Sequence, residues 1–152
     1  MRKSTALVAT AVLFVSFLSI MSGPSWALKG ERGAGRGVDS SGIEFSFRAR
    51  GTGTGTTATG AWKQTDAAGT HRGEISCMHV VTTASGRSAI LSGTVTDSTN
   101  PAAVGAPFTF AAFDGATAPD RYSFDSFSPS TCASVSSAAN TLQEGRITLR
   151  DA

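Results

Sequence analysis

The chain has 152 residues and a formal net charge of +2, from 13 Lys and Arg against 11 Asp and Glu. After Ala27 the two signs balance at eleven each, so net charge gives no reason to expect nucleic acid or an anionic membrane as a partner. Gly, Ala, Ser and Thr supply 67 of the 125 residues after Ala27, and Leu, Ile, Val and Phe only 21. Because disorder in apolar-poor chains goes with high net charge, we expect a folded domain whose small core needs a covalent staple.

The sequence begins with the pattern of a secretory signal peptide. Arg2 and Lys3 precede an apolar run over residues 6–21, and Ser25-Trp26-Ala27 has small residues at both positions that define a cleavage site. The run is shorter than the roughly 20 residues that a membrane-spanning helix needs. We therefore expect residues 1–27 to be removed and the protein to be secreted, with no membrane partner after cleavage.

Residues 28–41 differ in composition from the remainder of the chain. They carry Gly at positions 30, 33, 35 and 37, charges of both signs and no apolar period. This composition predicts a flexible N-terminal arm. A single β domain is then expected over residues 42–152.

Short alternating apolar runs predict β-strands through this domain. Ile43, Phe45 and Phe47 alternate with polar residues, which is typical of a half-buried strand. The Gly/Thr tract at 51–60 is a weak edge strand or an ordered loop, and it continues into residues 61–64 with Trp62 facing the core. Further strands are expected at 73–82, 88–97, 108–113, 121–127 and 145–150.

The central strand at 73–82 is predicted to place Ile75, Cys77, His79 and Val81 on one face and Met78 and Val80 on the other. In all, seven or eight short strands with turn signals between them predict an all-β fold, either an antiparallel sandwich or a small barrel. Cys77 and Cys132 are the two cysteines of the chain, and an exported protein favours their pairing in a disulfide over a reactive thiol.

Residue types that carry chemistry are present without a convincing pattern. His71 and His79 lie eight residues apart, which does not place them on one face of a regular element as a metal pair. Serine is frequent, but no G-x-S-x-G elbow occurs. Asp114, Asp120 and Asp125 fit turn formation better than a calcium loop. We predict no metal, cofactor or catalytic residue.

The order of several motifs resembles a known group of proteins. The motifs are F-S-F-x-A-R at 45–50, A-I-L-S-G-T-V at 89–95, F-T-F-A-A-F-D-G at 108–115, P-D-R-Y-S-F at 119–124 and G-R-I-T-L-R-D-A at 145–152. This arrangement, with its two cysteines, resembles small exported β-proteins of unassigned function from high-GC Gram-positive bacteria. The Gly/Thr tract at 51–60 departs from that pattern. The resemblance implies a fold and a location, and it carries over no activity.

The sequence is compatible with three functional hypotheses. The first is a non-catalytic extracellular binding or surface-interaction module, with an extracellular protein or a cell-wall component as partner. The second is a small-ligand carrier or enzyme built on a closed barrel. Its pocket candidates on predicted strands are His79, Glu74, Arg48 and Tyr122. The third is an exported protease inhibitor that presents the loop at 97–107.

Overall fold

The computed structural model describes residues 30–52, 56–127, 131–133 and 137–151. The expected signal peptide at 1–27 lies outside the described residues. Within these ranges, no helix has both the length and the apolar character to cross a membrane.

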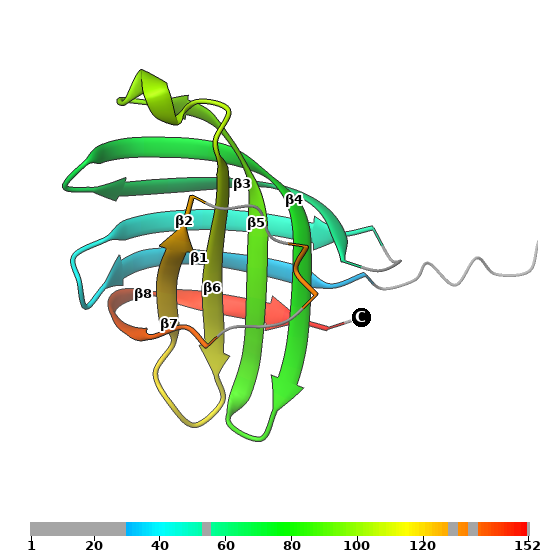
Figure 1. The fold of residues 1–152 in the computed structure, drawn as a ribbon. Helices are drawn as coiled ribbons and strands as arrows, with labels where there is room; N and C mark the ends of the chain where they lie inside the picture. Colours follow the sequence, from blue (N-terminus) through cyan, green and yellow to red (C-terminus); the bar gives the residue numbers. More distant parts are fainter. Residues whose placement is uncertain (1–29, 53–55, 128–130, 134–136, 152) are drawn as a thin grey trace, which may run out of the picture.

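Eight antiparallel strands form one closed barrel in which each strand pairs with the next and the last pairs with the first (Figure 1). A short 3-10 turn, η1 (Pro101–Ala103), precedes the sixth strand. The strands are β1 (Arg32–Asp39), β2 (Glu44–Gly51), β3 (Thr57–Asp66), β4 (Gly69–Thr83), β5 (Gly86–Ser98), β6 (Pro107–Gly115), β7 (Arg121–Ser126) and β8 (Asn140–Arg150). The all-β prediction is confirmed, and of its two architectures the barrel is the one that forms.

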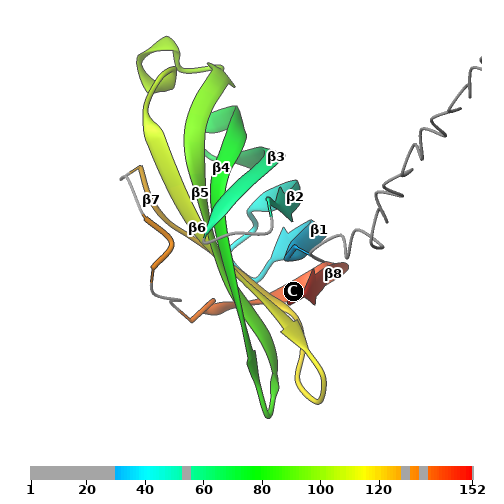
Figure 2. The ribbon, with the colours of Figure 1, turned by 90° about the vertical axis from the view of Figure 1, so that its right-hand side faces the viewer.

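The barrel is flattened, with two groups of strands that cross. In Figure 1, β1, β2, β3 and β8 run across the view, whereas β5, β6 and β7 run up and down in front of them. The β4–β5 and β6–β7 hairpins project together beyond the rest of the barrel, as Figure 2 shows. The pairing of β1 with β8 closes the sheet.

The prediction of a flexible arm is wrong for residues 32–39, because they form β1. Its inward positions are glycines, so the alternation of the strand is invisible to a search for apolar residues. A Cβ on Gly35 would lie 2.5 Å from the ring of Phe47 and 2.9 Å from Ile147. The interior side chains of β2 and β8 therefore occupy the space that a side chain on β1 would need.

Aromatic side chains fill the barrel interior. The ring of Trp62 stacks on that of Phe108 with centroids 4.2 Å apart, and Phe45 stacks on Tyr122 at 3.9 Å. Phe47 and Phe110 complete this cluster and are also buried. An eight-stranded barrel is just wide enough for side chains to fill it. The predicted core position of Trp62 is confirmed, and the interior is packed.

A bulge in β4 changes which residues face the core. The pairing with β5 shifts register between Ile75 and Cys77. As a result Ile75 and Met78 both join the main core, whereas Cys77 packs outside it against Ile90. The prediction of one shared face is therefore wrong for Ile75, which faces the core with Met78 and Val80, and right for Cys77, His79 and Val81, which share the outer face.

The predicted disulfide between Cys77 and Cys132 is confirmed. It ties the outer face of β4 to the connection between β7 and β8. That connection also packs through Ala138 against Ala111 and Phe113. The connection thus covers an apolar strip on the outside of the barrel.

Candidate functional site

The four pocket candidates do not meet at one site. Tyr122 is fully buried inside the barrel, whereas Arg48 and Glu74 are exposed on its outer face. His79 is also on the outside, with Nδ1 3.4 Å from Oε1 of Glu31. Arg48 and Glu74 line one shallow depression over β2, β3 and β4, and this is the closest association among the four.

Tyr122 belongs to a buried chain of hydrogen bonds. Nε1 of Trp62 donates to its hydroxyl at 3.0 Å, and that hydroxyl donates to Oε1 of Gln64 at 2.9 Å. Nε2 of Gln64 in turn donates to Oδ2 of Asp66 at 2.9 Å. Burial raises the pKa of the phenol above its ordinary value. These contacts satisfy the polar atoms inside the aromatic core and hold Tyr122 away from solvent.

The other groups considered for chemistry also have local structural partners. The ring of His71 is buried, with Nδ1 2.8 Å from Oγ of Ser98, and that Oγ accepts the N–H of Asn100 at 2.9 Å. Asp120 accepts the N–H of Gly115 at 3.0 Å across the β6–β7 turn, as turn chemistry predicts. Among the described residues, no group of three or more His, Cys, Asp or Glu side chains is placed to hold a metal ion.

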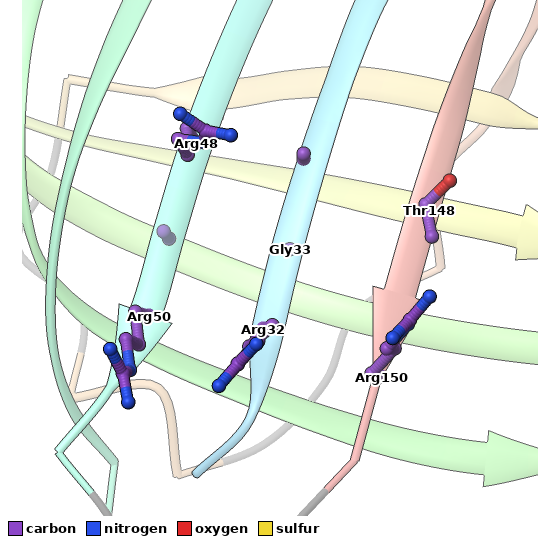
Figure 3. Close-up of a pocket in the computed structure, with 8 residues that line it drawn as sticks. Arg32, Gly33, Arg48, Arg50, Thr148 and Arg150 are labelled. Atoms are coloured by element: carbon purple, nitrogen blue, oxygen red, sulfur yellow. The ribbon is translucent and has the colours of Figure 1, made fainter. Parts of the chain in front are cut away.

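A different feature stands out on the outer face of β1, β2 and β8. A shallow groove of about 520 Å³ runs along β1, with arginines from all three strands around it (Figure 3). A second hollow of about 600 Å³ continues it along the same strand and shares Ala34, Arg48 and Thr148 with it. We call this continuous feature the arginine groove. The arginines that line it are Arg32, Arg36, Arg48, Arg50, Arg146 and Arg150.

Strand register explains how the arginines come together. Arg32 on β1 lies directly opposite Arg50 on β2 and Arg150 on β8, as Figure 3 shows. Further along β1, Arg36 lies opposite Arg146 of β8. These pairs place like charges on neighbouring strands at the same level.

The floor of the groove is made by the smallest residues of β1. Ala34 lies between the two arginine levels of that strand and is flanked by Arg48 on β2 and Thr148 on β8. Gly33 and Gly35 line the groove with backbone atoms. The groove is lowest at Ala34, where β1 presents a short side chain between its own Arg32 and Arg36.

Carboxylates neutralise other cations of this protein but not those of the groove. Arg72 pairs with Asp97 at 3.8 Å and Arg87 with Asp151 at 3.6 Å. No ion pair within the described residues includes an arginine of the groove. The arginines end at Arg36, and the hollow of about 480 Å³ that continues past it is flanked at Val38 by two glutamates, Glu44 and Glu144. The positive field is therefore confined to residues 32–36 of β1 and the residues opposite them.

Sequence reasoning missed this site because the balance of charges over the whole chain conceals it. The sequence signal was the spacing of Arg32 from Arg36 and of Arg48 from Arg50, which places each pair on one face of a strand. Only the register shows that the three strands align their arginines. No protein-family model matches the sequence, and no curated protein or solved structure matches it either.

Proposed function

We propose that this protein is an exported, non-catalytic binding module that holds an anionic ligand in the arginine groove. The observation that carries the proposal is the alignment of Arg32 with both Arg50 and Arg150. Like charges directly opposite each other on neighbouring strands destabilise a sheet. A fold that keeps three such guanidinium groups together, without carboxylates beside them, gains from an anion that neutralises them.

The chemistry of the side chains supports an anion with several oxygens. A guanidinium group stays charged at any physiological pH and donates two parallel hydrogen bonds to a carboxylate or phosphate. The groove uses arginine at all six of its cationic positions. Because the guanidinium group is a planar fork, it loses less side-chain freedom per hydrogen bond formed than an ammonium group does.

The packed interior weighs against the carrier or enzyme hypothesis. The space where a small barrel would hold a ligand is occupied by rings such as Trp62, Phe108 and Phe110. The polar candidates for that pocket point in different directions, with Tyr122 inside and Glu74 outside. An external surface therefore supports the proposed function better than the barrel interior.

Retention on phosphocellulose tests the proposal. Arg32→Gln should elute at clearly lower salt than the unmodified protein, because each lost phosphate contact lowers the salt slope by about 1. Arg72→Gln is the matched control, since it removes the same charge from an exposed position on β4. If both variants elute earlier by the same amount, net charge rather than the groove determines binding, and the proposal is wrong.

Export is tested separately. The protein recovered from the culture medium of a secreting bacterial host should have the mass of residues 28–152. A protein retained in the cell with an intact leader would contradict the exported location. Binding by the groove can be measured in either case, so the two parts of the proposal fail independently.

A further inference from the structure

We infer that the ligand of the arginine groove is a linear phosphodiester polymer without bases, lying extended along β1. This inference rests on the proposed function and names the class of ligand. The first observation behind it is that the cations form three levels along the strand. The levels are Arg50–Arg32–Arg150, then Arg48–Ala34–Thr148, then Ser46–Arg36–Arg146.

The spacing of the levels suits a chain of repeated anions. Successive levels are two residues apart, which is about 6.7 Å along a strand. Every level contains at least one arginine. One anionic group per level, joined to the next by a short spacer, places three negative charges among the six guanidinium groups.

The width of the groove suits a single chain. β2 and β8 flank β1 on either side, so the two arginine-bearing walls are separated by about 10 Å between strand axes. Ala34 leaves the middle of the floor low. A slender polymer can therefore reach the floor, whereas a wide, flat object touches only the rims.

The outer-face residues of the groove favour a partner other than a nucleic acid or a bilayer. Ala34, Ser46 and Thr148 are the uncharged side chains that face outward among the three levels. None of them is aromatic, so the groove offers no platform on which bases could stack. None is a large apolar group that could enter a bilayer, as membrane-binding surfaces commonly provide.

Phosphate fits the first level better than carboxylate does. Three guanidinium groups gather there, from Arg32, Arg50 and Arg150. A planar carboxylate is well satisfied by one bidentate fork. The two non-bridging oxygens of a phosphodiester share one negative charge, and each can accept more than one hydrogen bond, so side chains on three strands can reach them.

The glutamates at the end of the groove set the length of the bound segment. Glu44 and Glu144 lie on either side of Val38, one level beyond Arg36. A fourth phosphate at this level would meet two carboxylates. The groove should therefore bind three consecutive phosphates and gain nothing from a fourth inside it.

A length series measures this directly. Synthetic polyol phosphodiesters with one, two, three, four and six phosphates would be titrated by calorimetry at fixed ionic strength. We expect the three-phosphate oligomer to bind at least about tenfold more tightly than the single phosphate, as linked contacts do. Affinity should then level off between three and six phosphates. A continued rise with length would indicate nonspecific polyelectrolyte attraction and overturn the inference.

A steric variant separates a chain along β1 from a single anion at the first level. Ala34→Leu fills the floor without changing charge, so it should weaken the three-phosphate oligomer about tenfold while inorganic phosphate binds as before. Ala102→Leu makes the same change at an exposed position of η1, outside the groove, and is the control. Equal loss of affinity for the three-phosphate oligomer in both variants would overturn the extended placement. Unchanged affinity of Ala34→Leu would also overturn it, provided that both variants show normal thermal melts.

The same titrations distinguish this inference from the function on which it rests. Tighter binding of a sulfated glycan, a single-stranded oligonucleotide or anionic vesicles than of the three-phosphate oligomer would overturn the phosphodiester assignment and leave an anion-binding module. Failure of every anion to bind, with Arg32→Gln indistinguishable from Arg72→Gln, would overturn both.

Discussion

The carboxylate of Asp114 accepts a hydrogen bond at 2.8 Å from the backbone N–H of Leu149, a residue of the strand that closes the barrel. Asp120 accepts the N–H of Ile147 in the same way, at 2.7 Å. β7 pairs with β8 only at two positions near the start of β8. The two aspartates therefore supply the acceptors that a neighbouring strand would otherwise provide.

Removing either carboxylate should destabilise the barrel. Asp120→Ala leaves the buried N–H of Ile147 without its acceptor, which costs about 1–3 kcal/mol of unfolding free energy, and also removes the acceptor of the Gly115 N–H. Chemical denaturation monitored by circular dichroism measures this loss. Asp97→Ala is the control, because Asp97 is exposed and its ion pair with Arg72 should contribute less than about 1 kcal/mol. Equal losses of unfolding free energy in the two variants would show that the hydrogen bond between Asp120 and β8 contributes no more than an exposed ion pair.

The single tyrosine of the chain should titrate only when the protein unfolds. Burial raises the pKa of Tyr122 in the folded state above the value near 10 of an unfolded chain. The stabilisation from keeping the phenol neutral is therefore complete below about pH 10 and is lost as the pH rises further. Phenolate absorbance at alkaline pH should rise together with the loss of the circular dichroism signal of the fold. Phenolate formation near pH 10 in a protein that keeps its fold would contradict the buried position.

Gly35 should not tolerate a larger residue. Gly35→Val places a Cβ against the ring of Phe47 and next to Ile147, and overpacking of this kind costs about 1–3 kcal/mol. Ala34→Val makes a similar change on the exposed side of the same strand, where surface substitutions usually stay within about 0.5 kcal/mol. Thermal melts of the two variants give the comparison. Similar melting temperatures would place β1 outside the barrel.

The disulfide should supply a large share of the stability. Cys77 and Cys132 are 55 residues apart, and closing a loop of that length stabilises the fold by about 4 kcal/mol in the chain-entropy model. The double variant Cys77→Ala/Cys132→Ala should show this loss in denaturant titrations. The unmodified protein under reducing conditions is a second measurement of the same quantity. A loss below about 1 kcal/mol in both would mean that packing of the outer connection, through residues such as Ala138, holds the segment without the bond.

Local sequence patterns predicted the strands well where apolar residues mark the inner face. Phe45 and Phe47 of β2 alternate as expected, and so do Phe108 and Phe110 of β6. β1 was missed because glycine takes the inward positions where two neighbouring strands already fill the core. No scale that counts apolar side chains can register such a strand.

The errors in β4 and in the site have a different cause, since both depend on pairing between distant segments. A bulge between Ile75 and Cys77 places Ile75 on the opposite face from Cys77 and His79, and nothing in the local alternation marks it. The arginines of the groove are visible in the sequence, but their alignment follows from the register of β1 with β2 and β8. Because the charges of the chain nearly balance, the net charge does not reveal the concentration of arginines on this face.

The arginine groove crosses the seam at which the barrel closes, since β1 and β8 come from opposite ends of the described chain. An anion that bridges Arg32 and Arg150 therefore links two strands that are adjacent in the barrel but far apart in the sequence. Ligand binding to the closed form alone shifts the opening equilibrium by mass action. Ligand binding should therefore slow opening of the β1–β8 pair, which can be measured as slower proteolysis of the occupied than of the unoccupied molecule. Ligand binding would thus stabilise the same strand pair that forms the binding site.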